Sequence, residues 1–446
     1  MSANGKQSTF PRGVHPPERK QAAEGRPIAV LPTPKQVGIA LLQHIGAPCS
    51  ATVKPKTEVA LGDKIGDAEG FISAPVHASV AGTASRPGKA TLPNGRHVTV
   101  VPIKAAEEQP AAGRELYERI LGGDWSVGDI GSADPGAIAD RVREAGIVGL
   151  GGAAFPTHVK LRRNEKKPVD TLLINGCECE PYLTADDRLM IEAPARLVAG
   201  AQIAAHAIGA NRTFICIEDN KPEAAEAVRG VLAGTGLELR LMKTKYPQGG
   251  EKQLVKAALG REVPTGGLPL DVGVVVLNVG TTGAIAGAWL RNQALTHRVV
   301  TVTGAGINEP KNLLVPIGVS YQELIDFCGG MTDQAARVVA GGPMMGFTLG
   351  ELDAPLTKGT SGVTVLTRAD LKRAAETACV RCGRCVDVCP MRLVPTKIAL
   401  AARMEREDIV RRYHATACME CGCCAYVCPA SIPLVQLVRT GKLLLQ

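Results

Sequence analysis

The chain has 446 residues, enough for roughly three domains of about 150 residues each. Aromatic residues make up 3% of it and glycine occurs 50 times, a composition that indicates an α/β architecture with aliphatic cores. The net charge of +8 is spread along the chain without the aromatic and basic clusters of nucleic-acid binders, so no nucleic-acid partner is predicted.

Neither export nor a membrane span is expected. Residues 1–20 carry charges with no apolar run behind them, unlike a signal peptide. The most apolar segment, 272–290, is interrupted by Asn278, glycines and paired threonines, and its valine-rich half indicates a buried strand. Most of the 14 cysteines fall in two motifs near the C-terminus, which favours a reducing cytoplasm over a disulfide-bonded secreted protein.

The first part of the chain predicts a small β domain. Residues 28–103 alternate short apolar runs with turn residues, and the polar stretch 105–113 resembles a linker. From about 137 to 300 strands and helices alternate, which predicts a parallel sheet. The expected helices there are 137–145, 195–208 and 221–232, and the expected strands are 171–175 and 213–217.

The C-terminal third predicts two smaller units. Residues 299–340 show short strands around Gly304 and Gly306 with one helix at 321–328, which fits a compact α+β module. Residues 397–412 place apolar side chains among charges in a loosely helical pattern. We therefore expect the cysteine-rich end of the chain to be largely helical.

A glycine-rich loop at 146–157 is the first candidate binding element. Gly149, Gly151 and Gly152 can bring bare backbone amides close to a phosphate or a flat ring. The loop matches Gly-x-Gly-x-x-Ala, but a dinucleotide fingerprint needs a strand directly before it, and residues 137–145 predict a helix. The usual dinucleotide motif is therefore rejected.

A second candidate element follows the predicted strand 171–175. Asn175, Glu178 and Glu180 open a polar, acidic run that continues to Asp186 and Asp187. Such groups at the carboxyl end of a strand are well placed to bind a ligand in an α/β sheet. The alternative is a solvated loop. Cys177 and Cys179 have no second cysteine pair near them and are interpreted as structural.

Two cysteine runs carry the strongest chemical signal. Each has the spacing Cys-x-x-Cys-x-x-Cys-x-x-x-Cys-Pro, in which three thiolates bind one 4Fe-4S cluster and the fourth reaches the other cluster. One predicted ligand set is Cys379, Cys382, Cys385 and Cys428, and the other is Cys418, Cys421, Cys424 and Cys389. Zinc and disulfides are the alternatives, but zinc rarely uses three equally spaced thiols followed by Cys-Pro. Cys423 lies between ligands and is predicted to be a bystander.

Several segments together resemble the C subunit of the Rnf ion-translocating electron transport complex. The resemblance extends over nearly the whole chain and is carried by residues 13–18, 149–157, 178–188, 217–221, 245–250 and 341–346 and by both cysteine runs. It implies membrane subunits of the Rnf complex as partners, and ferredoxin or flavodoxin as indirect ones. It also implies a peripheral place on the cytoplasmic face of the bacterial inner membrane.

The central part is similar to the flavin-bearing, NADH-oxidising subunit of respiratory complex I. This similarity implies an FMN site formed by Gly149, Gly151, Gly152, Lys160, Asn175, Glu178, Gly249, Gly250, Asn278 and Thr281. It also implies that Phe155, Glu180 and Glu251 face NADH. Ala154 and His158 stand where the family usually or commonly has glycine, and we expect them to tighten the pocket without abolishing it.

The remaining regions also have family counterparts. The β domain resembles a lipoyl-like barrel-sandwich, but its turn at 76–78 carries no lysine, so no lipoyl or biotinyl group is expected. Residues 299–340 resemble a soluble ligand-binding β-grasp module. The expected domains are a barrel-sandwich-like domain at 1–104, an FMN/NADH-binding α/β domain at 114–298, a β-grasp module at 299–365 and a two-cluster ferredoxin-like domain at 366–446.

The cofactors implied are FMN and two 4Fe-4S clusters, with NAD(H) as substrate. A nicotinamide gives up two electrons as hydride and a cluster accepts one at a time, so a flavin is required between them. The resemblance implies an NADH-linked oxidoreductase and translocase subunit. The alternatives are a corrinoid reductase of a propanediol microcompartment and an electron-relay scaffold with a vestigial nucleotide pocket.

Overall fold

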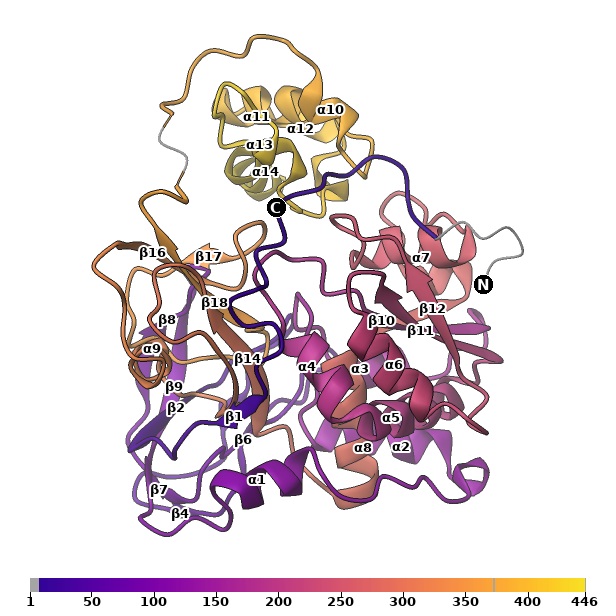
Figure 1. The fold of residues 1–446 in the computed structure, drawn as a ribbon, viewed down its shortest axis with the longest axis vertical. Helices are drawn as coiled ribbons and strands as arrows, with labels where there is room; N and C mark the ends of the chain where they lie inside the picture. Colours follow the sequence, from indigo (N-terminus) through magenta and orange to yellow (C-terminus); the bar gives the residue numbers. More distant parts are fainter. Residues whose placement is uncertain (1–7, 372–373, 446) are drawn as a thin grey trace.

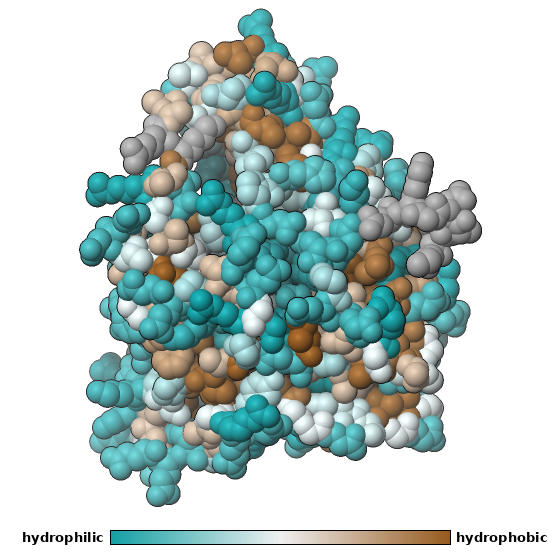
Figure 2. All heavy atoms as spheres, viewed as in Figure 1, coloured by the Kyte–Doolittle hydropathy of each residue, from teal (hydrophilic) through white to brown (hydrophobic). Residues whose placement is uncertain are grey.

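The computed structural model describes residues 8–371 and 374–445. Figure 1 shows a broad body with a helical domain, formed by the two cysteine runs, standing at one end of it. On the face shown in Figure 2, hydrophilic side chains dominate and apolar ones form separate patches, one of them on the helical domain. No helix within the described ranges is long and apolar enough to cross a membrane.

The N-terminal β domain is built from two small sheets around an aliphatic core that includes Val37, Ile39 and Ile103. One contains β2 (Gln36–Ala40), β4 (Glu58–Val59), β7 (Gly82–Ala84), β8 (Gly88–Thr91) and β9 (His97–Ala105). The other contains β3 (Ser50–Ala51), β5 (Lys64–Asp67) and β6 (Val76–His77). Residues 76–78, expected to form a turn, are buried and include strand β6, and a Cβ on Gly146 would lie 2.9 Å from His77 Nδ1. This segment therefore packs against the start of the glycine-rich loop.

The central domain has the parallel sheet that the alternating pattern predicts. Its strand order is β12-β11-β10-β13, with β10 at Thr171–Gly176, β11 at Arg212–Glu218, β12 at Glu238–Met242 and β13 at Val274–Asn278. One face packs against α2 (Pro135–Glu144), α5 (Pro194–Ile208), α6 (Pro222–Gly230) and α8 (Val279–Arg291). The other face packs against α7 (Glu251–Leu259). Burial on both faces explains the continuous apolar runs in the strands.

Several elements were not predicted from the sequence. They include β12, α7 and α4 (Ala185–Glu192), which begins inside the acidic run. The valine-rich half of segment 272–290 is strand β13, as predicted, and the other half is helix α8. A short helix, α1 (Gly113–Ile120), follows the predicted linker.

A six-stranded mixed sheet forms the third unit, with the order β1-β15-β14-β18-β16-β17. Its strands are β1 (Ile28–Val30), β14 (His297–Thr303), β15 (Lys311–Pro316), β16 (Ala335–Ala340), β17 (Phe347–Thr348) and β18 (Gly362–Thr367). Helix α9 (Tyr321–Phe327) matches the predicted one and is capped by Ser320. Strand β1 pairs with β15, so residues 28–30, which were expected in the N-terminal β domain, belong to this sheet instead. The four domain boundaries stay predictions.

The cysteine-rich end is helical, as expected. It contains α10 (Arg384–Asp387), α11 (Pro395–Arg403), α12 (Glu407–Arg412), α13 (Cys423–Tyr426) and α14 (Leu434–Leu443). The predicted helix at 397–412 is two helices, because Glu405 adopts a φ of 50° between them. Gly383 and Gly422, at equivalent positions of the two runs, both have a positive φ directly before a short helix. The two runs therefore fold as a structural repeat.

Candidate functional site

The first part of the site lies where two neighbouring strands end. Asn175 of β10 and Asn278 of β13 are paired in register at the carboxyl edge of the sheet. From β10 the chain continues to β11 and β12 on one side, whereas β13 lies on the other, and ligands bind at such a switch point in α/β sheets. Asn175 Nδ2 donates to Gly249 O (2.7 Å), and Asn278 Oδ1 caps α8 by accepting from Gly280 N (2.9 Å). The two strand ends thus bring four predicted flavin residues, Asn175, Asn278, Gly249 and Gly250, into one region.

The glycine-rich loop lies beside these strand ends. Leu150 N donates to Thr281 Oγ1 (2.8 Å), and Gly149 N donates to Phe155 O (2.9 Å). A Cβ on Gly151 would come within 2.8 Å of Asn278 Nδ2, whereas one on Gly152 would meet nothing within 4 Å. The loop therefore presents an exposed, side-chain-free backbone next to Asn278, which fits the flat ring or phosphate of a flavin.

The acidic run is packed and is not a solvated loop. Glu178 accepts from Asp186 N (2.7 Å) and Asp187 N (3.2 Å) and thereby caps α4. Asp186 accepts from Asn278 Nδ2 (2.6 Å). Burial, and secondarily the charge of Glu178, raises the pKa of Asp186 to about 7 and that of Asp187 to about 6. This network joins the acidic run to the end of β13.

Two predicted residues on opposite sides of the sheet edge form an ion pair. Lys160 Nζ, on α3 (Thr157–Leu161), lies 2.5 Å from Glu251 Oε1 at the start of α7. Lys160 also donates to Val276 O (3.1 Å). The pair is part-exposed, so both groups can exchange this contact for one with a charged ligand.

Glu180 contacts a module that the sequence did not connect to it. Its Oε1 accepts from Met344 N (2.7 Å) and Met345 N (3.1 Å), in the loop between β16 and β17. Burial raises the pKa of Glu180 to about 6. The loop 341–346 of the six-stranded sheet is therefore part of the site, a placement that no local sequence pattern signals.

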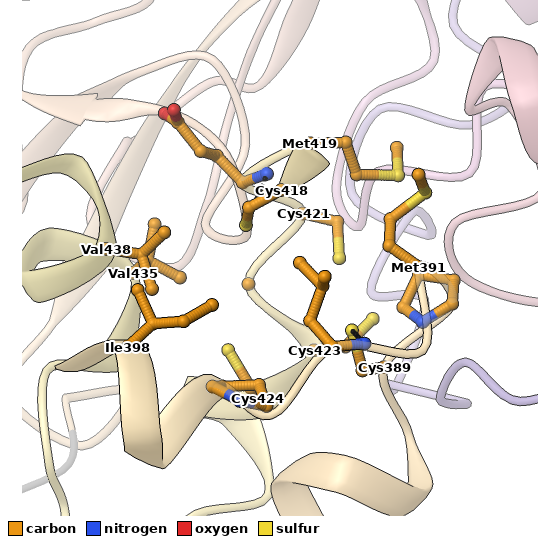
Figure 3. A pocket seen from close by; sticks show the side chains of 15 residues that line it. Cys389, Met391, Ile398, Cys418, Met419, Cys421, Cys423, Cys424, Val435 and Val438 are labelled. Carbon is orange, nitrogen blue, oxygen red and sulfur yellow. Dashed lines mark hydrogen bonds between the residues drawn. The ribbon is translucent and has the colours of Figure 1, made fainter. Parts of the chain in front are cut away.

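Five cysteines, four of them predicted ligands of one cluster, line a single cavity in the helical domain. Cys389 of the first run lies with Cys418, Cys421 and Cys424 of the second, and Figure 3 shows their sulfur atoms around a common space. Apolar side chains, including Ile398, Val435 and Val438, close the cavity. Four thiols around one apolar cavity suit a 4Fe-4S cluster, and the set is the one that the crossed-ligand rule predicts. Cys423 is fully buried at the same cavity.

The other four predicted ligands belong to a second group in the same domain. Cys385 and Cys428 are buried in one apolar cluster, with Cys379 packed against it. Cys382 is exposed. The fourth cysteine of the second run is thus brought to the first run, as Cys389 of the first run is brought to the second.

The cavity of Cys389 and the second run lies against the strand-end region. Tyr246 Oη donates to Cys421 O (2.7 Å), and a Cβ on Gly250 would come within 2.7 Å of Met419 Cε. Cys179 Sγ accepts from Gly249 N (3.3 Å) and packs against the cluster of apolar residues that contains Cys421. Cys177 is buried and points to Cys216 O, which fits the structural role predicted for it, whereas Cys179 occupies the contact between the two sites.

Comparison with known proteins identifies each of these parts. The RnfC barrel sandwich hybrid domain matches residues 8–108, the Nuo51 FMN-binding domain 142–287, the SLBB domain 299–348 and the 4Fe-4S dicluster domain 378–432. The chain is 43% identical to the C subunit of the Na⁺-translocating ferredoxin:NAD⁺ oxidoreductase complex of Acetobacterium woodii, over 98% of this chain and 97% of that one. The chain belongs to the RnfC family.

Other relatives agree with this assignment. The C subunit of the proton-translocating ferredoxin:NAD⁺ oxidoreductase complex of Clostridium ljungdahlii is 42% identical, over 89% of this chain and 85% of the relative. The C subunit of the ion-translocating oxidoreductase complex of Rhodobacter capsulatus is 39% identical, over 89% and 75%. Membership of the RnfC family confirms the predicted fold class, with its barrel-sandwich, flavin, β-grasp and two-cluster domains, and confirms FMN and 4Fe-4S clusters as the cofactors.

The two positions expected to tighten the pocket, Ala154 and His158, have different structural consequences. Ala154 adopts a φ of 53°, a left-handed conformation that favours glycine, and its Cβ is buried near Gly359. His158 is buried, with Nε2 3.1 Å from Phe71 O and its ring edge-on to Phe71. His158 therefore joins α3 to the N-terminal β domain instead of narrowing the pocket.

The backbone at Ala154 predicts a sharp dependence on side-chain shape. Ala154→Val is expected to lower the free energy of unfolding by about 2 kcal/mol, because a β-branched residue is strongly disfavoured at positive φ. Ala154→Gly should stay within about 1 kcal/mol of wild type, since the relief of strain is offset by the greater flexibility of the unfolded chain. Urea unfolding, followed by circular dichroism, measures the free energy of unfolding of both variants. Equal values for the two would contradict the proposed backbone strain at Ala154.

Proposed function

We propose that this chain is the NAD(H)-linked subunit of a membrane-bound, ion-translocating ferredoxin:NAD⁺ oxidoreductase. The observation that carries the proposal is the direct contact between the strand-end region and the cavity of Cys389, Cys418, Cys421 and Cys424. Bound FMN supplies the exchange of hydride for single electrons that such a contact requires. The subunit would sit peripherally on the cytoplasmic face of the membrane, with the other Rnf subunits as its partners and ferredoxin or flavodoxin as an indirect one.

The residues divide into three proposed roles. The backbone of Gly149, Gly151 and Gly152, with Lys160, would hold the phosphate and ring of FMN. Polar contacts to the flavin would come from Asn175, Glu178, Gly249, Gly250, Asn278 and Thr281. Phe155, Glu180 and Glu251 would face the nicotinamide nucleotide, and the Lys160–Glu251 pair would open to admit it.

The arrangement of cysteines suggests an order for the clusters. The set of Cys418, Cys421, Cys424 and Cys389 adjoins the flavin side, whereas Cys382 of the other set is exposed. The cluster bound by Cys418, Cys421, Cys424 and Cys389 would therefore take electrons from the flavin. The cluster with the exposed Cys382 would pass them to a partner.

An anaerobic optical titration tests the function. The purified protein should contain about eight iron atoms, as two 4Fe-4S clusters require, and its bound flavin should bleach on addition of NADH. A scaffold with a vestigial pocket would hold clusters and leave the flavin oxidised. A corrinoid reductase would reduce a cobalamin with NADH and would lack genes for membrane subunits beside its own.

Glu180 provides a prediction that separates nucleotide binding from flavin binding. Glu180→Gln keeps an oxygen that can accept from Met344 N and Met345 N, so the variant should retain FMN and both clusters. NADH should bleach its flavin about tenfold to a hundredfold more slowly, because the charge that orients the nucleotide is gone. Dithionite should still reduce it fully. Stopped-flow bleaching at the wild-type rate would exclude this role, and loss of FMN would move Glu180 into the flavin site.

The raised pKa of Glu180 predicts the pH dependence of the same step. With a pKa of about 6, the carboxylate is ionised at pH 7 and takes up a proton as the pH falls through 6. The rate at which NADH bleaches the wild-type flavin should therefore decrease as the pH is lowered through about 6. Glu180→Gln should be slow at every pH and should not show this decrease. The same decrease of the rate at low pH in the variant would show that another group titrates.

A further inference from the structure

An extended segment near the N-terminus connects the cluster domain to the candidate flavin site. We call residues 8–26 the strap, and Figure 1 shows it passing beneath the cluster helices and down to β1. Gly13 N donates to Val388 O (3.0 Å), next to the cluster ligand Cys389. Val14 forms a bridge with Tyr246, whose hydroxyl contacts the other cysteine run.

The far end of the strap inserts a lysine into the acidic run. Lys20 is 5% exposed, and its Nζ donates to Glu178 O (3.0 Å), Glu180 O (3.2 Å) and Leu183 O. These three carbonyls use all three hydrogen-bond donors of an ammonium group. One buried side chain therefore holds three backbone carbonyls of residues 178–183 close together.

The same loop contains two residues in a disfavoured backbone conformation. Glu178 has a φ of 43° and Tyr182 a φ of 73°, both in the left-handed region that non-glycine residues rarely adopt. Such conformations persist only where the surroundings hold them. The strap supplies that support twice, since Tyr182 N also donates to Glu18 O (2.8 Å).

Burial, and after it the charge of Lys221, lowers the pKa of Lys20, and the carboxylates of Glu178 and Glu218 oppose this shift. Lys221 is itself paired with Glu218 (3.5 Å). The three carbonyls of Glu178, Glu180 and Leu183 hold the amine of Lys20 beneath this loop.

We propose that Lys20 is a positioning residue that holds the loop 178–183 in the shape required for flavin and nucleotide binding. This inference rests on the proposed function of the site. Lys20 does not contact the ligand in this assignment. It sets the backbone from which Glu178 caps α4 and Glu180 reaches the loop 341–346.

The test compares Lys20→Met with a matched control, Lys245→Met. Methionine keeps most of the aliphatic stem of Lys20 and removes the ammonium group. Lys245 Nζ donates to the strap at Phe10 O (3.0 Å), so its replacement also removes a lysine contact between strap and flavin domain, but none to residues 178–183. Hydrogen exchange, measured by mass spectrometry on flavin-free protein, gives the protection of the loop amides. Quenching of FMN fluorescence gives the affinity of the protein for FMN.

In Lys20→Met, amides of residues 178–187 should exchange at least tenfold faster, FMN should bind about tenfold more weakly, and the iron content should be unchanged. Lys245→Met should match the wild type in exchange at 178–187. Should Lys20→Met not accumulate, Lys20→Gln, which keeps a shorter donor, should show the same local change to a smaller extent.

Two results would overturn the inference. Unchanged exchange at 178–187 would show that Lys20 does not hold the loop, and faster exchange throughout the chain would show a general role in stability. Wild-type protein that fails to bind FMN would instead contradict the proposed function, while the exchange measurement would still report on Lys20.

Discussion

Replacing Cys389 by alanine is expected to remove the cluster bound by Cys418, Cys421 and Cys424, although Cys389 belongs to the other run. The reason is the shared cavity, in which Cys389 is the fourth thiol. Iron content should fall from about eight atoms to about four, because each 4Fe-4S cluster is lost as a unit. Iron analysis of anaerobically purified protein measures this directly.

Double variants decide which run each ligand serves. Cys389→Ala combined with Cys424→Ala should retain the same iron as either single variant, because both changes affect one cluster. Cys389→Ala combined with Cys385→Ala should lose nearly all iron. The control is Cys423→Ala, which removes a buried thiol from the same cavity and should keep both clusters. The ligand assignment would be reversed if the Cys389/Cys424 double variant lost all its iron and the Cys389/Cys385 double variant lost only half.

The second large effect is expected at the glycine-rich loop. Gly151→Val should yield protein with both clusters and without flavin. Even the Cβ would come within 2.8 Å of Asn278 Nδ2, and the rest of the side chain would fill space beside the strand ends. The flavin-to-iron ratio, taken from the optical spectrum and iron analysis, gives the result.

A glycine elsewhere in the same domain supplies the control for this loop. Gly230, at the end of α6, has open space around its Cβ position, so Gly230→Ala should keep its flavin. A wild-type flavin content in Gly151→Val would show that residues 149–152 are not the FMN site. Loss of iron together with flavin would indicate general misfolding instead.

Local patterns predicted many of the central elements, and they also predicted the cluster ligands, which stay a prediction. Strands β10, β11 and β13 and helices α2, α5 and α6 lie where apolar periodicity placed them, because burial of one or both faces leaves a regular signal in the sequence. The cysteine spacing likewise predicted the crossed ligand sets, since three closely spaced thiols bind one cube and the fourth cysteine, before a proline, reaches the other. Elements with weaker signals, such as β12 and α7, were not predicted.

Long-range contacts had no such signal. The carboxylate of Glu180 accepts hydrogen bonds from the amides of Met344 and Met345. The amine of Lys20 donates to the carbonyls of Glu178 and Glu180. Both contacts join segments that are far apart in the sequence. Strand β1 joins a sheet whose other members begin after residue 296, because pairing depends only on which edges the packed domains leave open. The cluster chemistry could be predicted from cysteine type and spacing, which act over a short stretch of chain, whereas the flavin site was predicted only from a resemblance to a known flavin-bearing subunit. The contact between these two sites, through Tyr246, Met419 and the strap, depends on how whole domains pack, and only the tertiary structure decided it.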